Sequence, residues 1–140
     1  MLTLLIACLT LGSCTAARWY LHRTSRRDSD HAGGLVRLRS LWNRGAAFGL
    51  GIRFDMVVAA SFAALGALWT RRKQAPAGVG LLLGGGVSNL LERLRRGAVY
   101  DYIQFPKASG RLKQYIFNLA DFAIFLGAAL LALSSRKRKR

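Results

Sequence analysis

The sequence predicts an all-α membrane protein with four transmembrane helices, and three observations lead to this prediction. The chain has 140 residues, which allows one domain. Hydrophobic residues make up 52% of it, although its formal net charge is +16. Charged side chains are absent from four long stretches, residues 1–17, 56–70, 74–91 and 122–135. This segregation leaves too little polar sequence for the surface of a soluble protein, so we expect residues 1–140 to form a single polytopic membrane domain.

The expected helices are short for membrane spans. A span needs about 20 apolar residues, with a lower limit of about 17. We place the helices at about residues 2–21, 54–70, 75–93 and 116–134. The first reaches this length only if it includes Arg18. Because no Lys or Arg precedes the first segment, we expect it to be a retained helix and not a cleaved signal peptide.

Small residues recur at every fourth position in two segments. They are Gly80, Gly84 and Ser88 in the third segment and Ala59, Ala63 and Ala67 in the second. Such stripes let helix backbones approach closely within lipid, which favours a packed bundle. Glycine and alanine are also common in membrane helices in general, so the pattern leaves both interpretations open.

The charges do not settle the orientation of this bundle. Four helices place both termini, the basic turn at 71–73 and the basic tail at 136–140 on one side, with 8 Lys and Arg residues. The loops 22–53 and 94–115 lie on the other side, and 13 Lys and Arg residues lie in or beside them. The raw count opposes a cytoplasmic position of the termini, whereas the density of charge near the helix ends favours it.

The high positive charge does not indicate a nucleic-acid binder. A pI near 11.5 is common in such proteins, but they distribute their basic residues over a polar surface. Here the basic residues flank apolar segments, and the tail at 136–140 is better explained as a solvated charge run beside lipid. We therefore expect membrane lipids as partners and no nucleic acid.

The chain contains 6 acidic residues, and their positions are informative because a carboxylate near a bilayer is costly. Asp28 and Asp30 lie in a polar, basic loop, where they balance charge. Asp55 lies at the start of an expected helix, where the helix dipole favours an acid. The remaining acids, Asp101 and Asp121 above all, are the candidates for chemistry.

Asp101 and Asp121 are expected at the same membrane face, because one loop joins the third and fourth helices. Asp101 lies in the alternating segment 97–103, which is typical of an extended strand. Asp121 follows Asn118 by three positions, which would place both on one helical face. Two carboxyls in one site share a proton, so that one can accept a proton from water while the other donates. Spacing alone fits a capping or loop role for either Asp equally well.

Three sequence blocks surround these acids and resemble a known family. The blocks are residues 43–49 (NRGAAFG), residues 85–101, which contain SNLLER and end at Asp101, and residues 117–121 (FNLAD). In this order they resemble the lipoprotein signal peptidases, or type II signal peptidases, which are four-helix intramembrane aspartyl proteases of bacteria. Each block alone is weakly specific, whereas the three together are strongly specific.

The resemblance implies a catalytic dyad of Asp101 and Asp121 that activates a water molecule. It also implies a set of residues that bind substrate or support the site: Asn43, Gly45, Phe48, Asn89, Glu92, Arg93 and Asn118. Asn89 and Arg93 are four positions apart on the expected third helix, so they present donors on one face. Alternatively, Arg93 is an interface residue whose side chain extends toward the headgroups.

The resemblance further implies that the enzyme cleaves signal peptides from diacylglyceryl-modified prolipoproteins in the bacterial inner membrane. It places both termini in the cytoplasm and makes residues 35–50 a small extracytoplasmic β-like platform over the site, with Gly45 at a turn and Phe48 dipping into lipid. No cofactor and no metal ion are expected, and we expect a monomer.

Two departures from the family pattern support an alternative from another class. The chain has residues 13–18 where the family has an acid with a nearby Lys, and Glu92 where the family has Asp. These differences fit a catalytically silent relative that binds signal helices or lipids. A third alternative is a small transporter that uses the same acids as a proton relay, but it leaves the Asn and Gly patterns unexplained.

Overall fold

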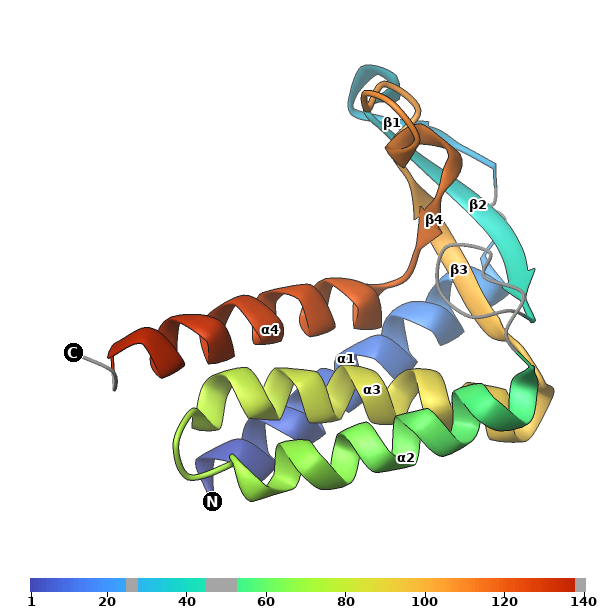
Figure 1. The fold of residues 1–140 in the computed structure, drawn as a ribbon. Coiled ribbons are helices and arrows are strands. Elements are labelled where there is room, and N and C mark those ends of the chain that lie inside the picture. The colour runs from blue at the N-terminus through green and yellow to red at the C-terminus, as the bar shows by residue number, and fades with distance from the viewer. Residues whose placement is uncertain (25–27, 45–52, 138–140) are drawn as a thin grey trace.

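Four helices and one small sheet make up the fold, which we describe from a computed structural model covering residues 1–24, 28–44 and 53–137 (Figure 1). The helices in these ranges are α1 (Leu2–Arg23), α2 (Phe54–Thr70), α3 (Pro76–Arg96) and α4 (Leu119–Lys137). The strands are β1 (Asp30–His31), β2 (Val36–Asn43), β3 (Val99–Gln104) and β4 (Ile116–Phe117). Two short 3-10 helices complete the elements, η1 (Ala32–Gly34) and η3 (Leu112–Gln114).

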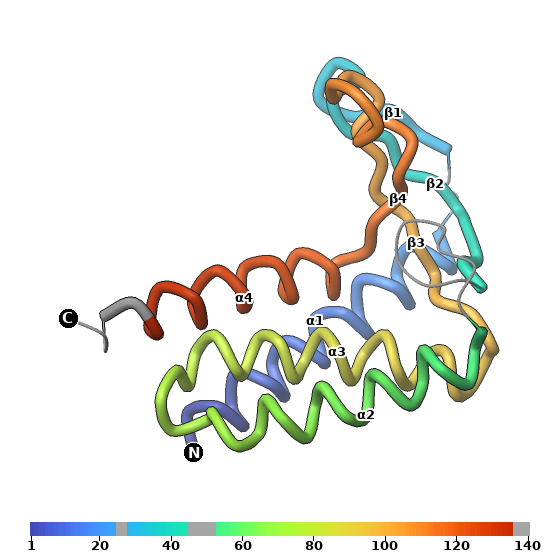
Figure 2. The backbone as a smooth tube through the Cα atoms, in the orientation of Figure 1, coloured from blue at the N-terminus to red at the C-terminus, as the bar shows by residue number. Residues whose placement is uncertain are grey.

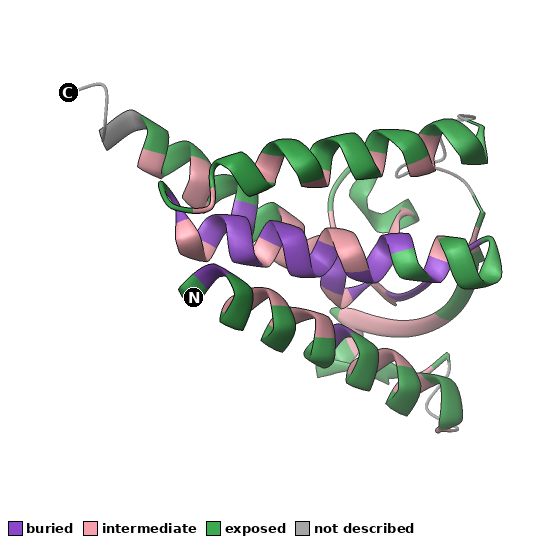
Figure 3. Cartoon of the chain, turned by 90° about the horizontal axis from the view of Figure 1, so that it is seen from below, coloured by how far each residue is buried: buried purple, intermediate pink, exposed green. Residues whose placement is uncertain are grey.

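Helix α3 is the centre of the helical layer. Helices α1, α2 and α4 each pack against it, and buried positions concentrate along α3 while the helices around it are mostly exposed (Figure 3). A buried group of Ala75, Val79 and Leu83 forms the core at one end, with Leu65 and Leu68 of α2 packed on it. The remaining helices therefore present much of their apolar surface outward.

Glycines of α3 allow its close contacts with α1 and α4. A Cβ atom on Gly84 would lie 2.6 Å from the carbonyl oxygen of Ala7 in α1. A Cβ atom on Gly85 would lie 2.7 Å from the carbonyl oxygen of Ala120 in α4. The structure thus confirms close packing by the small residues of the third segment.

The packing interpretation of the alanine stripe in the second segment was wrong. Ala59, Ala63 and Ala67 are all exposed, and α2 contacts the core through Leu65 and Leu68 instead. Larger aliphatic side chains bury more surface against α3, so they face inward in preference to the alanines.

The four strands form an antiparallel sheet in the order β1-β2-β3-β4, located beyond one end of the helical layer (Figure 2). In its central pair, Leu41 lies opposite Asp101 and Trp42 opposite Tyr100. The description of the fold as all-α with a β-like platform in 35–50 is therefore incomplete, because both inter-helix loops contribute strands. Residues 45–50 of that expected platform lie outside the described ranges.

The helix boundaries differ from the predictions at five ends, by one to three residues. Helix α2 matches, whereas α1, α3 and α4 continue to Arg23, Arg96 and Lys137, and α3 begins at Pro76. Helix α3 ends before Gly97, which adopts a left-handed conformation at φ 68° that glycine tolerates without strain. Helix α4 begins at Leu119 and not at residue 116, because Ile116 and Phe117 pair with β3.

Only α1 among the described helices is both long and apolar enough, by these two criteria, to cross a membrane. Helix α2 and the stretch Leu119–Ser135 are apolar but shorter. Exposed apolar side chains nevertheless occur on all three, including Leu9, Phe62 and Phe125.

Candidate active site

Strand β3 carries Asp101 into the junction between the sheet and the helices. The carboxyl group is almost fully buried, with 3% of the residue exposed. Asn43 at the end of β2 donates from Nδ2 to Oδ2 of Asp101 at 3.0 Å. Asn118 donates from Nδ2 to Oδ1 at 2.7 Å. Each oxygen of this carboxyl group thus accepts a hydrogen bond from a side-chain amide.

Asp121 lies in the first turn of α4, where it forms a reciprocal cap with Asn118. The backbone N–H of Asn118 donates to Oδ2 of Asp121 at 2.9 Å, and the backbone N–H of Asp121 donates to Oδ1 of Asn118 at 3.1 Å. This capping-box arrangement satisfies donors at the helix start. The prediction that both residues lie on one helical face is wrong in this detail, because Asn118 precedes the helix.

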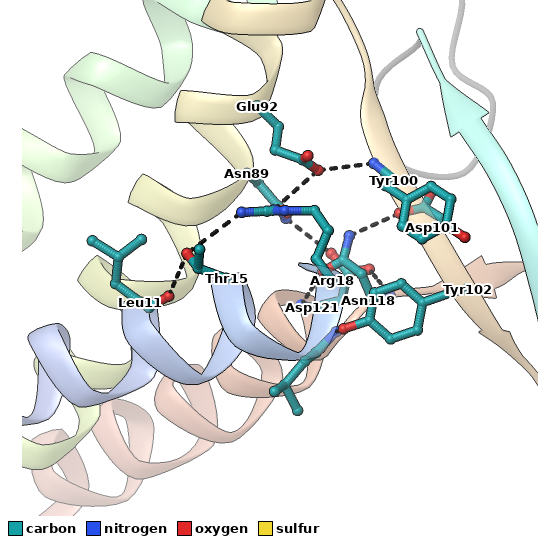
Figure 4. Close-up of polar contacts among 11 residues, drawn as sticks. Leu11, Thr15, Arg18, Asn89, Glu92, Tyr100, Asp101, Tyr102, Asn118 and Asp121 are labelled. Atoms are coloured by element: carbon teal, nitrogen blue, oxygen red, sulfur yellow. Dashed lines mark hydrogen bonds and ion pairs between the residues drawn. The ribbon is translucent and has the colours of Figure 1, made fainter. Parts of the chain in front are cut away.

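Asn118 therefore joins the two acids (Figure 4). Its side-chain amide nitrogen contacts Asp101, while its amide oxygen and backbone N–H contact Asp121. Asn89 of α3 donates from Nδ2 to Oδ1 of Asp121 at 3.1 Å. Two carboxyl groups from different elements, β3 and α4, are thus held at one place by amide groups.

Burial raises the pKa of Asp101 to about 6. The hydrogen bonds from Asn118 and Asn43 oppose this rise, since they stabilise the charged form. The nearby Asp121 carboxylate adds to the rise in pKa, and the Arg93 guanidinium acts against it. A carboxyl group with such a pKa can hold or release a proton near neutral pH, which general acid and base catalysis requires.

Asn89 and Arg93 lie on the same face of α3, one turn apart, as their spacing predicts. Arg93 is close enough to Asp101 and Asp121 to interact electrostatically with both. The side-chain oxygen of Asn89 is buried and accepts no hydrogen bond from any residue that the structure describes. This oxygen is available to a donor on a bound molecule.

These groups line a cavity of about 630 Å³ between the sheet and the helices α2, α3 and α4. Its polar end contains the two acids together with Asn43, Asn89, Arg93 and Asn118. Its apolar walls come from α2, α3 and α4, including Leu65, Leu68, Leu82, Ile124 and Phe125. The cavity can therefore take an extended, mostly apolar chain whose polar backbone meets the carboxyl groups.

Glu92 was predicted to support the site, and the structure places it away from the cavity. Its Oε2 accepts a hydrogen bond from the backbone N–H of Tyr100 at 2.9 Å and forms an ion pair with Nη1 of Arg18 at 3.1 Å. Sequence reasoning did not assign Arg18 to the site. The signal available was that Arg18 is the first charged residue in α1 and Glu92 the only acid in α3.

Tyr102 is a second residue that the sequence did not single out. Its hydroxyl oxygen accepts a hydrogen bond from the backbone N–H of Leu119 at 3.1 Å, at the start of α4. Burial raises the pKa of this hydroxyl to about 12, so it stays protonated. Tyr102 thus links the strand that carries Asp101 to the helix that carries Asp121.

Two predicted site residues, Gly45 and Phe48, lie outside the described ranges. Within those ranges, no three His, Cys, Asp or Glu side chains are grouped so that they could hold a metal ion.

Comparison with known proteins places this chain in a family. The family model described as "Signal peptidase (SPase) II" matches residues 5–137. A lipoprotein signal peptidase of Halothermothrix orenii is 41% identical over 106 residues, covering 71% of this chain and 69% of the relative. One of Nitrobacter hamburgensis is 35% identical over 106 residues, covering 67% of this chain and 65% of the relative. The alignment with a Methylorubrum extorquens relative likewise spans only 60% of that protein's length.

The fold is shared with solved structures. A bacterial membrane enzyme, determined by the in meso method at 2.3 Å resolution, superposes with a TM-score of 0.84 at 20% identity, covering 98% of this chain and 88% of that structure. A second, determined at 1.9 Å resolution, gives a TM-score of 0.80 at 21% identity, covering 94% and 90%. With the family match over nearly the whole sequence, the chain belongs to the signal peptidase II family.

Proposed function

We propose that this chain is an intramembrane aspartyl endopeptidase that removes signal peptides from lipid-modified bacterial prolipoproteins. The observation that carries the proposal is the pair Asp101 and Asp121, joined through Asn118 at the polar end of a cavity with apolar walls. The lipoprotein signal peptidases among the relatives supply the substrate class.

The reaction needs one protonated and one ionised carboxyl group. The ionised group takes a proton from a water molecule, whose oxygen attacks the scissile carbonyl carbon while the protonated group donates to the carbonyl oxygen. The tetrahedral intermediate then collapses as the leaving nitrogen receives a proton. The products are the carboxylate end of the signal peptide and a free amine on the lipid-modified cysteine.

The surrounding amides and Arg93 hold the substrate and the dyad. The unpartnered oxygen of Asn89 can accept a backbone N–H of the substrate, and Arg93 can donate to a substrate carbonyl. No metal or other cofactor has a part in this scheme. Because burial raises the pKa of Asp101 to about 6, this carboxyl group can hold or release a proton near neutral pH.

We further propose that all four helices cross the bacterial inner membrane. Helix α2 is the shortest at 17 residues, which is the lower limit of about 17 for a span. The exposed apolar side chains on α1, α2 and α4 would then face lipid. In this orientation both termini lie in the cytoplasm, and the sheet covers the site on the extracytoplasmic side. The enzyme acts as a monomer that contacts membrane lipids and its substrate.

The substrate enters sideways from the bilayer. The cavity is walled by α2 on one side and α4 on the other, and both helices present apolar side chains. A signal helix with its diacylglyceryl chain can therefore reach the acids without leaving an apolar environment.

Cleavage of a lipid-modified prolipoprotein by the purified protein tests this function. Asp101→Asn is expected to lower turnover at least about 100-fold, because it removes an acid-base group. Asp55→Asn is the matched control, since Asp55 is exposed and pairs with Arg53 at the start of α2. Binding of substrate without any turnover in the wild type would contradict the proposal and favour a silent binding protein.

A further inference from the structure

The ion pair between Arg18 and Glu92 lies behind the site and outside the cavity. Arg18 is on α1, five residues before the end of that helix at Arg23. Glu92 is near the C-terminal end of α3. Glu92 is 5% exposed and Arg18 is 20% exposed. A buried carboxylate of this kind is costly unless it is paired and hydrogen-bonded, and here it is both.

The same oxygen of Glu92 is hydrogen-bonded to the backbone of the strand that carries Asp101. Oε2 accepts the backbone N–H of Tyr100, the residue directly before Asp101, at 2.9 Å. Strand β4 pairs with Ile103 and Gln104, so no strand that the structure describes lies beside Tyr100 on this edge of β3. Glu92 supplies the missing acceptor and ties the strand to α3 across the Gly97 turn.

The position of Glu92 near a helix C-terminus makes the Arg18 guanidinium necessary. The partial negative charge at that end of a helix disfavours an acid. Nη1 of Arg18 offsets this charge at 3.1 Å, and Nη2 of Arg18 also contacts Oγ1 of Thr15 at 3.5 Å within α1 (Figure 4). Without Arg18, the Glu92 carboxylate would gain by moving toward solvent and leaving Tyr100.

We propose that Arg18 is a positioning residue of the peptidase, which holds Glu92 on the Tyr100 N–H and so fixes Asp101 beside Asn43 and Asn118. The inference rests on the proposed function for its catalytic readout. It assigns to α1 a role in the site, although α1 contributes no residue to the cavity wall in the part of the chain described.

The test compares Arg18→Met with Arg23→Met, an identical change on the same helix. Arg23 is exposed and lies over the Trp19 ring at 4.7 Å, away from Glu92. Arg18→Met is expected to lower kcat on a lipid-modified prolipoprotein between about 10-fold and 100-fold with KM unchanged, as expected for a displaced catalytic group. Arg23→Met is expected to keep the wild-type kcat.

A double substitution separates positioning from simple loss of a contact. In Arg18→Met with Glu92→Gln, a neutral amide still accepts the Tyr100 N–H and needs no cation. This variant is expected to fold and to recover kcat relative to Arg18→Met, because an unpaired buried carboxylate is worse than none. A kcat no higher than that of Arg18→Met, or loss of the fold in the double variant, would overturn the proposal.

Amide hydrogen exchange of residues 99–104 tests the positioning without any turnover. Exchange is expected to accelerate in Arg18→Met and to stay at the wild-type rate in Arg23→Met. Equal exchange in the two variants would overturn the inference. Absence of cleavage by the wild type would instead contradict the proposed function, while the exchange rates would still decide whether Arg18 holds the strand.

Discussion

The two sides of α3 are built differently. Toward α1, glycine brings the backbones so close that a Cβ on Gly84 would lie 2.6 Å from the carbonyl oxygen of Ala7. Toward α2, the contact is made by side chains such as Leu65, and no residue of α2 is fully buried. The α1 side thus fixes the frame that carries Asn89 and Arg93, while the α2 side leaves room for the cavity.

In the proposed mechanism, the α1 side of α3 positions the catalytic groups and the α2 side admits the substrate. The side with tight backbone contacts contains the Arg18–Glu92 pair behind the strand. The looser side has a cavity with apolar walls that ends at the two acids. Substitutions on the first side should change stability and kcat, and those on the second should change KM.

The largest effect on folding is expected from Gly84→Ala, which places a methyl group against the α1 backbone. Overpacking of this kind costs about 1–3 kcal/mol, because neither backbone can move freely. Thermal unfolding in detergent measures the loss. The control is Gly66→Ala on α2, where a Cβ meets no atom within 4 Å. Equal stability of the two variants would show that the α1 contact is not tight.

A smaller effect, on binding, is expected from Ala64→Trp, because Ala64 lines the cavity and is exposed. The indole occupies space that the substrate needs, so KM should rise about tenfold, equivalent to ~1.4 kcal/mol of binding free energy. Phe62→Trp changes an exposed position of the same helix and serves as the control. A fall in kcat with unchanged KM would argue against the cavity as the substrate path.

The predictable part of the structure was the part with a strong local signal. Apolar segments gave the four helices, the glycines of α3 gave its close contacts, and three sequence blocks gave the candidate acids. The two-residue strands β1 and β4 were not predictable, because so short a segment has no periodicity and depends on its partner. Asn118 was found as a site residue, but not its capping position, since β4 shortens the start of α4.

The Arg18–Glu92 pair shows a second limit of sequence reasoning. The two residues are far apart in the sequence, and each has an ordinary explanation alone: Arg18 as a charge at a helix end and Glu92 as a conservative variation. Only the packing of α1 on α3 brings them to 3.1 Å.

The smallest expected effect is a shift in the pH profile of Asn43→Ala. Asn43 donates to Asp101 and stabilises its ionised form, so its loss should raise the pKa of Asp101 further above about 6. The limb of the activity profile that Asp101 governs should move upward by about half to one pH unit. Gln114→Ala, another amide at the cavity, is the control. A downward shift would contradict the described contacts, in which Asn118, Arg93 and Asp121 also face Asp101.

The central claim is that Asp101 and Asp121 act as one unit on a single water molecule. Turnover of a lipid-modified prolipoprotein should be measured for Asp101→Asn, Asp121→Asn and the double variant. When two groups act as one unit, removing either one already removes the contribution of both to the rate. The double variant is therefore predicted to be no slower than the slower single variant. Two losses that multiply in the double variant, or full activity in either single variant, would contradict the claim.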